Sequence, residues 1–163
     1  MRQLTTFVLS VTAIATVYVV YASASQSPGQ SPQVQSPQVQ SPESTSQTVW
    51  TGVYTEAQAY RGEKVADTTC IGCHGPKLDG GDSGPKLVGD VFIANWSSQS
   101  VGELFSWLQE AMPAEAPGTL SKDETAAVLA YILKLNNIPA GKTDLSTDRA
   151  SLDRIRITET PAR

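Results

Sequence analysis

Cys70-Ile71-Gly72-Cys73-His74 contains both cysteines and the single histidine of the 163-residue chain. The two thiols lie three positions apart, and an imidazole follows directly. A closed four-ligand zinc site is excluded, because no further Cys or His exists to complete it. A thioredoxin-like redox pair expects a βαβ context, whereas the flanking sequence indicates helices and Gly/Pro-rich loops. The pattern therefore points to a site that uses two thiols and one imidazole.

The C-x-x-C-H pattern is typical of a c-type haem attachment site. Two thiols at this spacing, at the end of a helix, reach the two vinyl groups of one porphyrin, and the adjacent imidazole then lies under the iron. The covalent bonds hold haem in a domain that is too small to enclose it otherwise. We therefore predict one covalently attached haem c, bonded to Cys70 and Cys73, with His74 as an iron ligand.

The second axial ligand is predicted by elimination. His74 is the only histidine, and Met112 is the only methionine besides Met1 at the start of the chain. Iron held by His and Met is the arrangement in cytochromes c, where the thioether raises the reduction potential. The alternative role for Met112 is packing. The iron would then be open or bound by lysine, as in a gas sensor or a haem enzyme.

The N-terminal part of the chain has the composition of an export signal and a linker. Residues 1–24 combine Arg2, an apolar run and Ala22-Ser23-Ala24, which is the pattern of a secretory signal peptide. Residues 4–22 carry no charge, so an uncleaved membrane anchor is the alternative. Residues 25–49 are rich in Ser, Pro and Gln, which predicts a disordered linker. We expect a periplasmic or extracytoplasmic protein, with membrane contact only where the leader is retained.

Residues 50–142 are the segment expected to fold compactly, and residues 143–163 form a tail with a short helix over 147–154. Gly and Pro punctuate residues 75–89, which predicts a loop. No strand alternation is evident, so the predicted fold class is all-α. Capping-box patterns, in which a hydroxyl residue precedes Glu or Gln by three positions, predict the starts of three helices: 56–68, 101–110 and 122–135.

Together these features resemble a class I monohaem cytochrome c, particularly the modules associated with bacterial quinoprotein dehydrogenases. Beyond the haem motif, the resemblance rests on six pieces of sequence: Gly52-Val-Tyr-Thr-Glu-Ala-Gln58, Gly84-Pro-Lys-Leu-Val-Gly89, Trp96, Leu104-Phe105, Met112-Pro113 and Leu129-Ala-Tyr-Ile132. The resemblance implies three to five helices around one covalently attached haem. It also implies thioether bonds at the two cysteines and His/Met axial ligation of the iron.

The resemblance further implies roles for two residues near the haem. The carbonyl of Pro85 accepts a hydrogen bond from the second nitrogen of His74, which fixes the ring and raises its basicity. The alternative for Pro85 is a simple turn residue. Trp96 gives its indole N–H to a haem propionate, with core packing as the alternative. Gly62 and Tyr131 match the point where the family's first and last helices cross.

The predicted function is one-electron transfer outside the cytoplasmic membrane. Both axial positions are filled in this reading, so no substrate reaches the iron and we expect no enzymatic activity. The expected partners are redox proteins, with a dehydrogenase as donor and an oxidase or another cytochrome as acceptor. The net charge of −4 argues against nucleic acid as a partner. The alternatives are a haem enzyme or gas sensor with an open iron site, and a dedicated cytochrome subunit of a dehydrogenase complex.

Overall fold

The structure, a computed structural model, describes residues 47–161. The predictions for the leader and for most of the linker fall on residues 1–46 and lie outside the described residues. Between residues 47 and 161, no helix is long and apolar enough to cross a membrane. The described chain is mostly helical, and its helices follow one another in this order: α1 (Glu56–Thr69), α2 (Ile71–His74), α3 (Asp90–Trp96), α4 (Val101–Ala111), α5 (Lys122–Leu135) and α6 (Arg149–Leu152).

The all-α prediction is confirmed, and the three helices expected from capping patterns correspond to α1, α4 and α5. The described residues form six α-helices, of which α2 and α6 are only four residues long, and one 3-10 helix (Val49–Thr51). The predicted tail helix is therefore shorter than expected. Helix α3 was missed because Gly89, the residue before it, has a φ of +86° and offers no capping side chain. Burial of the Phe92 and Ile93 side chains stabilises α3 instead.

Helices α4 and α5 begin at complete capping boxes, as the sequence predicts. The hydroxyls of Ser100 and Ser121 accept hydrogen bonds from the backbone N–H groups of Glu103 and Glu124. The two glutamates in turn accept from the serine N–H groups, at 2.6 and 2.9 Å. These bonds satisfy N–H groups that a helix start otherwise leaves without a partner.

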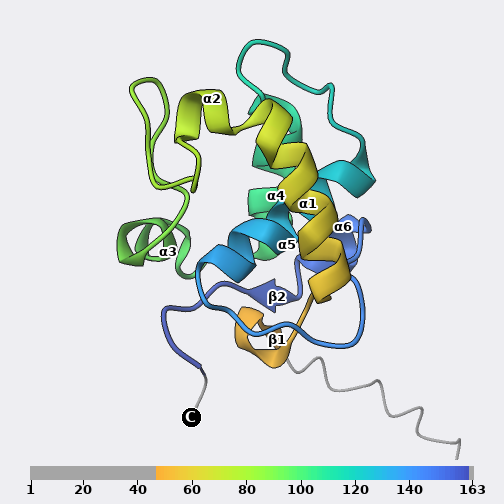
Figure 1. Cartoon of the computed structure of the whole chain (residues 1–163). Coiled ribbons are helices and arrows are strands. Elements are labelled where there is room, and N and C mark those ends of the chain that lie inside the picture. Colours follow the sequence, from red (N-terminus) through yellow and green to blue (C-terminus); the bar gives the residue numbers. More distant parts are fainter. Residues whose placement is uncertain (1–46, 162–163) are drawn as a thin grey trace, which may run out of the picture. The chain divides into compact units, whose positions relative to one another are not determined.

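Helices α1 and α5 pack against each other across the centre of the fold (Figure 1). A Cβ atom on Gly62 would lie 1.8 Å from the carbonyl oxygen of Ala127, so the close approach requires glycine. The nearest neighbour of Gly62 is thus Ala127, one turn before the expected Tyr131. Tyr131 lies half-buried farther along α5, where burial and the carboxylates of Glu63 and Asp67 raise its pKa.

A short parallel strand pair joins the start of the described chain to its end. Strand β1 (Gln47–Thr48) pairs with β2 (Ile155–Arg156). The expectation of no strand was wrong here, because two-residue strands are too short to show alternation. The Trp50 indole N–H donates to the carbonyl of Thr158 at 2.9 Å, which adds a second link. In Figure 1 the strand pair lies at the end of the fold opposite α2.

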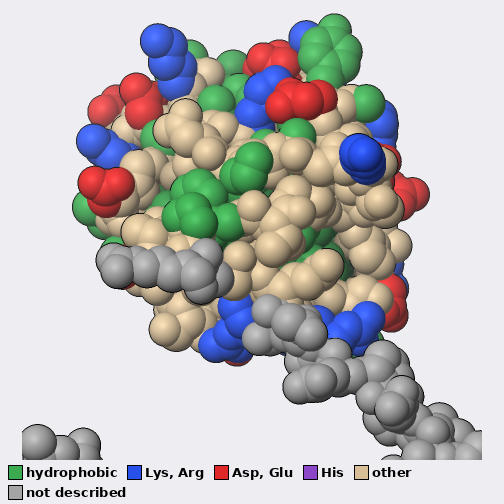
Figure 2. Space-filling view, turned by 90° about the horizontal axis from the view of Figure 1, so that it is seen from below, with side chains coloured by type: hydrophobic (Ala, Val, Ile, Leu, Met, Phe, Trp, Pro, Cys, Tyr) green, Lys and Arg blue, Asp and Glu red, His purple; other side chains and the backbone are tan. Residues whose placement is uncertain are grey.

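The C-terminal tail packs on the helices. Its aliphatic side chains Leu145, Leu152 and Ile157 are 3% exposed or less. Gln58 of α1 holds the tail backbone through two buried hydrogen bonds with Leu145, at 2.9 and 2.6 Å. Figure 2 looks onto this end of the molecule, where charged side chains lie mainly toward the edges and hydrophobic side chains are visible between them. The tail is therefore an integral part of the fold.

Candidate haem-binding site

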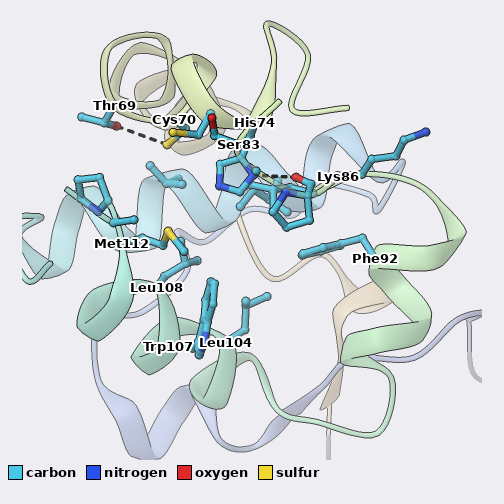
Figure 3. A pocket seen from close by; sticks show the side chains of 18 of the residues that line it. Thr69, Cys70, His74, Ser83, Lys86, Phe92, Leu104, Trp107, Leu108 and Met112 are labelled. Atoms are coloured by element: carbon cyan, nitrogen blue, oxygen red, sulfur yellow. Dashed lines mark hydrogen bonds between the residues drawn. The ribbon is translucent and has the colours of Figure 1, made fainter. Parts of the chain in front are cut away.

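The two thiols and the imidazole lie together on one helical turn. Cys70 ends α1 and begins α2, so Cys70, Cys73 and His74 occupy positions i, i+3 and i+4, which share a face of the helix. The backbone N–H groups of Cys73 and His74 donate to the Cys70 carbonyl, at 3.2 and 3.0 Å. Both cysteines are free thiols, and all three side chains line one cavity (Figure 3).

His74 is buried and held in one orientation. Its Nδ1 lies 2.7 Å from the carbonyl oxygen of Pro85. Because a carbonyl oxygen only accepts hydrogen bonds, Nδ1 carries the proton and Nε2 keeps its lone pair for a metal. The preceding Gly84 makes this approach possible, since a Cβ there would lie 2.8 Å from Nδ1. The structure thus places Pro85 in the position that the sequence resemblance implies.

Met112 lines the same cavity on the side that faces the α2 turn (Figure 3). Its N–H completes the last turn of α4 by donating to Leu108 at 3.0 Å. The backbone of Met112 itself is extended, and Pro113 follows, so the helix ends and the chain turns along the cavity. The only methionine of the described residues therefore lies in the same cavity as the only histidine.

The cavity encloses about 290 Å³ and has mainly apolar walls. Trp96 of α3 lies in its wall, with ring centroids 6.5 Å from Phe92 and 6.0 Å from Trp107. The predicted attachment residues Cys70 and Cys73 and the predicted iron ligands His74 and Met112 all line this cavity. Aliphatic side chains that were not predicted from the sequence complete the walls: Leu87, Leu104, Leu108, Leu120, Val128 and Ile132.

Trp107 is a cavity residue that the sequence analysis missed. It stands on α4 with its ring beside Trp96, in an edge-on arrangement. A sequence signal was present, because Leu104, Trp107 and Leu108 recur at helical spacing just before Met112. Residues at that spacing share the helix face that carries the methionine toward the cavity.

The environments of the two thiols differ. Burial raises the pKa of Cys70, and its contact with the Thr69 hydroxyl at 3.4 Å partly offsets this. The pKa of Cys73 is raised chiefly by its hydrogen bond to the Glu115 carboxylate, at 3.5 Å from Sγ. Both shifts favour the protonated thiol at neutral pH.

The residues present fit a covalently held haem. One wall offers two free thiols and an imidazole with a free Nε2, the facing wall offers a thioether, and the walls between them are apolar. Between residues 47 and 161, no three His, Cys, Asp or Glu side chains are grouped as a metal site. Two thiols, an imidazole and a thioether are the donor set of a c-type haem.

Comparison with known proteins identifies the same class. Residues 57–132 match the family model for cytochrome c oxidase, cbb3-type, subunit III. The chain is also 33% identical over 72 residues to the cytochrome bc1 complex cytochrome c subunit of Mycobacterium leprae (strain TN). The aligned region covers 44% of this chain and 25% of that subunit. Residues 57–132 therefore form a cytochrome c domain, a class that carries covalently bound haem c.

A solved structure is also similar to this chain. It is the crystal structure of the sulfane dehydrogenase SoxCD from Paracoccus pantotrophus, with 21% sequence identity and a TM-score of 0.45. The match covers 61% of this chain and 52% of that one. This chain thus spans a quarter of the bc1 subunit and about half of the SoxCD chain.

Proposed function

We propose that this chain is an extracytoplasmic one-electron carrier whose residues 50–142 hold one haem c. Cys70 and Cys73 would form the thioether bonds, and His74 and Met112 would bind the iron. The haem supplies a centre that cycles between Fe(II) and Fe(III). The observation that carries the proposal is the shared cavity, which brings both thiols, the oriented imidazole and the thioether together.

The protein's contribution lies in the ligands and their surroundings. The Pro85 carbonyl accepts a hydrogen bond from the Nδ1–H of His74, which orients the ring and raises its basicity. The soft sulfur of Met112 favours the reduced iron and so raises the potential. The apolar walls limit water around the site, which also favours the less charged reduced form.

Trp96 has a proposed role in holding the haem at its polar edge. Its indole sits in the cavity wall beside Trp107, and an indole N–H in a mostly apolar wall needs a hydrogen-bond acceptor. A propionate supplies that acceptor. With two axial ligands in place, no iron coordination position remains for a substrate, which makes the protein a carrier and not an enzyme.

The proposed partners are redox proteins, with a dehydrogenase as electron donor and an oxidase or another cytochrome as acceptor. Electron-transfer encounters use small interfaces. The contact surface is the mouth of the cavity, between the loops at 75–90 and 111–119, where Cys73 and Glu115 are both found. Residues 1–24 act as an export signal or an anchor, and residues 25–49 as a linker to the haem domain.

A second candidate is a permanent cytochrome subunit of a respiratory complex. Both the matching family model and the bc1 relative are described as subunits of larger complexes. Mild detergent extraction from the native host distinguishes the two functions. A free carrier purifies alone, whereas a subunit purifies with a large redox partner at fixed stoichiometry.

The proposed function is tested on the mature protein from an exporting host that attaches haem c. Mass spectrometry is expected to show one haem added to the polypeptide and to reveal whether residues 1–24 remain. The oxidised protein is expected to show the weak far-red absorption band of a Met–iron bond. Strong binding of carbon monoxide to the native reduced protein would mean an open iron site and would contradict the carrier function.

A further inference from the structure

The loop after α4 holds an acidic side chain at the mouth of the cavity. Residues 113–116 form a turn in which the Ala116 N–H donates to the Pro113 carbonyl at 2.9 Å. The Thr119 hydroxyl donates to the Ala116 carbonyl at 2.8 Å and tightens the loop further. Glu115 is thus fixed three residues after Met112, on the wall of the cavity that faces α2.

From this turn, Glu115 reaches across to the opposite wall. Its Oε1 lies 3.5 Å from Sγ of Cys73, which is 42 residues earlier in the chain. This contact joins the loop that carries Met112 to the helical turn that carries His74. The sulfur of Cys73 is one of the two proposed attachment atoms, so the carboxylate lies next to the point where haem would join the protein. A thioether sulfur donates no hydrogen bond, so in the haem-loaded protein the turn at residues 113–116 keeps Glu115 there.

The charge of Glu115 has no close counter-charge in the described structure. None of the ion pairs between residues 47 and 161 includes it. Lys86 is the one Lys or Arg among the described residues that line the cavity, and its ammonium points outward, away from Met112 (Figure 3). A negative charge near the haem therefore acts without local neutralisation.

We propose that Glu115 lowers the reduction potential of the haem by holding an uncompensated carboxylate beside the Cys73 attachment. The inference rests on the proposed function. Its physical basis is that Fe(III) haem carries one more positive charge than Fe(II) haem, so a nearby negative charge stabilises the oxidised form. Glu115 thus opposes Met112, whose sulfur favours the reduced form. The Met112 loop then carries both a residue that raises the potential and one that lowers it.

The test is a potentiometric titration of the haem-loaded full chain and its variants. In Glu115→Gln, the Fe(II) to Fe(III) ratio at a fixed applied potential is expected to rise about threefold, from the loss of one partly screened charge. Glu110→Gln is the matched control, because Glu110 is exposed near the end of α4 but does not line the cavity. It removes the same net charge and is expected to change the ratio less than about 1.5-fold.

Two further variants separate charge from structure. Glu115→Asp keeps the carboxylate and is expected to stay close to the wild-type potential. Glu115→Ala removes the same charge as Glu115→Gln. It is measured instead if Glu115→Gln fails to accumulate. The inference would be overturned if Glu115→Gln and Glu110→Gln shifted the reduction potential equally. It would also be overturned if Glu115→Asp shifted the potential as much as Glu115→Gln does.

The same measurements distinguish failure of this inference from failure of the proposed function. A wild-type chain that carries no covalent haem by mass spectrometry contradicts the proposed function and this inference with it. A wild-type chain that carries haem, with a potential that Glu115→Gln and Glu115→Ala leave unchanged, contradicts this inference alone. Lower ionic strength is expected to widen the gap between the wild type and Glu115→Gln, since salt screens exposed charges.

Discussion

Two ends of the described fold are built by different means. The α2 end carries α2 and the cavity, and the tail end is formed by residues 143–161 and β1. At the α2 end, glycine and proline turns and one short helical turn surround a cavity of about 290 Å³. At the tail end, aliphatic side chains are almost completely buried and the backbone is paired between β1 and β2. The tail end is packed by its own side chains, whereas the α2 end presents apolar walls and the proposed haem ligands to a cavity.

This contrast separates what holds the domain together from what gives it chemistry. Apolar walls around an open cavity lack packing partners, and filling them with haem supplies those contacts. Packing of the tail on α1 and α4 does not depend on the haem, because its contacts are made by protein groups alone. We therefore expect changes at the α2 end to alter haem properties first, and changes at the tail end to alter stability first.

The largest expected effect is at the α2 end. Replacing Cys70 and Cys73 together by Ser removes both proposed attachment atoms, so complete loss of covalent haem is expected. Mass spectrometry of the mature chain measures this directly. Ser83→Ala, which changes a cavity-lining hydroxyl with no attachment role, is the control and should keep its haem. Covalent haem on the double variant would contradict the proposed site.

At the tail end, Leu152→Ala should produce the next largest effect. Leu152 is fully buried between the tail and the helices, so its truncation should lower the free energy of unfolding by about 2–5 kcal/mol. Chemical denaturation followed by circular dichroism provides the measurement. The folded variant should keep the far-red band of the wild type. A loss of that band without a loss of stability would show that the two ends are not separable.

Met112→Leu tests the α2 end without removing the haem. The substitution nearly preserves volume, so the tail should keep its packing and the free energy of unfolding should change by less than about 1.5 kcal/mol from packing alone. The reduction potential is expected to fall by on the order of 0.1 V, within the span of about 0.8 V that axial ligands control. The far-red band should disappear. An unchanged potential would assign Met112 to packing.

The smallest expected effect is an acid dependence at the tail end. A hydrogen bond from Thr55, together with the Arg61 guanidinium 2.6 Å away, lowers the pKa of Asp144. Because the folded state favours the charged form, this contribution is present at neutral pH. It is lost as the pH falls below about 4, the range in which an unfolded Asp takes up its proton.

Asp144 is about half exposed, so the interaction contributes less than about 1 kcal/mol. Asp144→Asn should therefore slightly flatten the loss of stability between about pH 5 and 3, when urea unfolding is measured across that range. Asp67→Asn is the matched control, since Asp67 pairs with Lys64 only at 4.0 Å on the helix surface. Identical profiles for the wild type and Asp144→Asn would show that the contact has no energetic role.

The sequence predicted the local features of the fold well, for a physical reason. Helix starts depend on a side chain and a backbone group three residues apart, as at Ser100 and Ser121, so the signal lies within a few residues. The i, i+3, i+4 spacing of the haem motif is equally local. Helix α3 lacked such a signal, because it is held by burial of Phe92 and Ile93 in the tertiary structure.

By itself, the sequence determined which donors exist: two thiols, one imidazole and, beyond Met1, one thioether. Only the tertiary structure decided which groups tune and support them. The Pro85 carbonyl reaches His74 across 11 residues, Glu115 reaches Cys73 across 42, and Gln58 holds Leu145 across 87. Composition and local spacing carry the identity of ligands, but contacts between distant segments depend on how the helices pack.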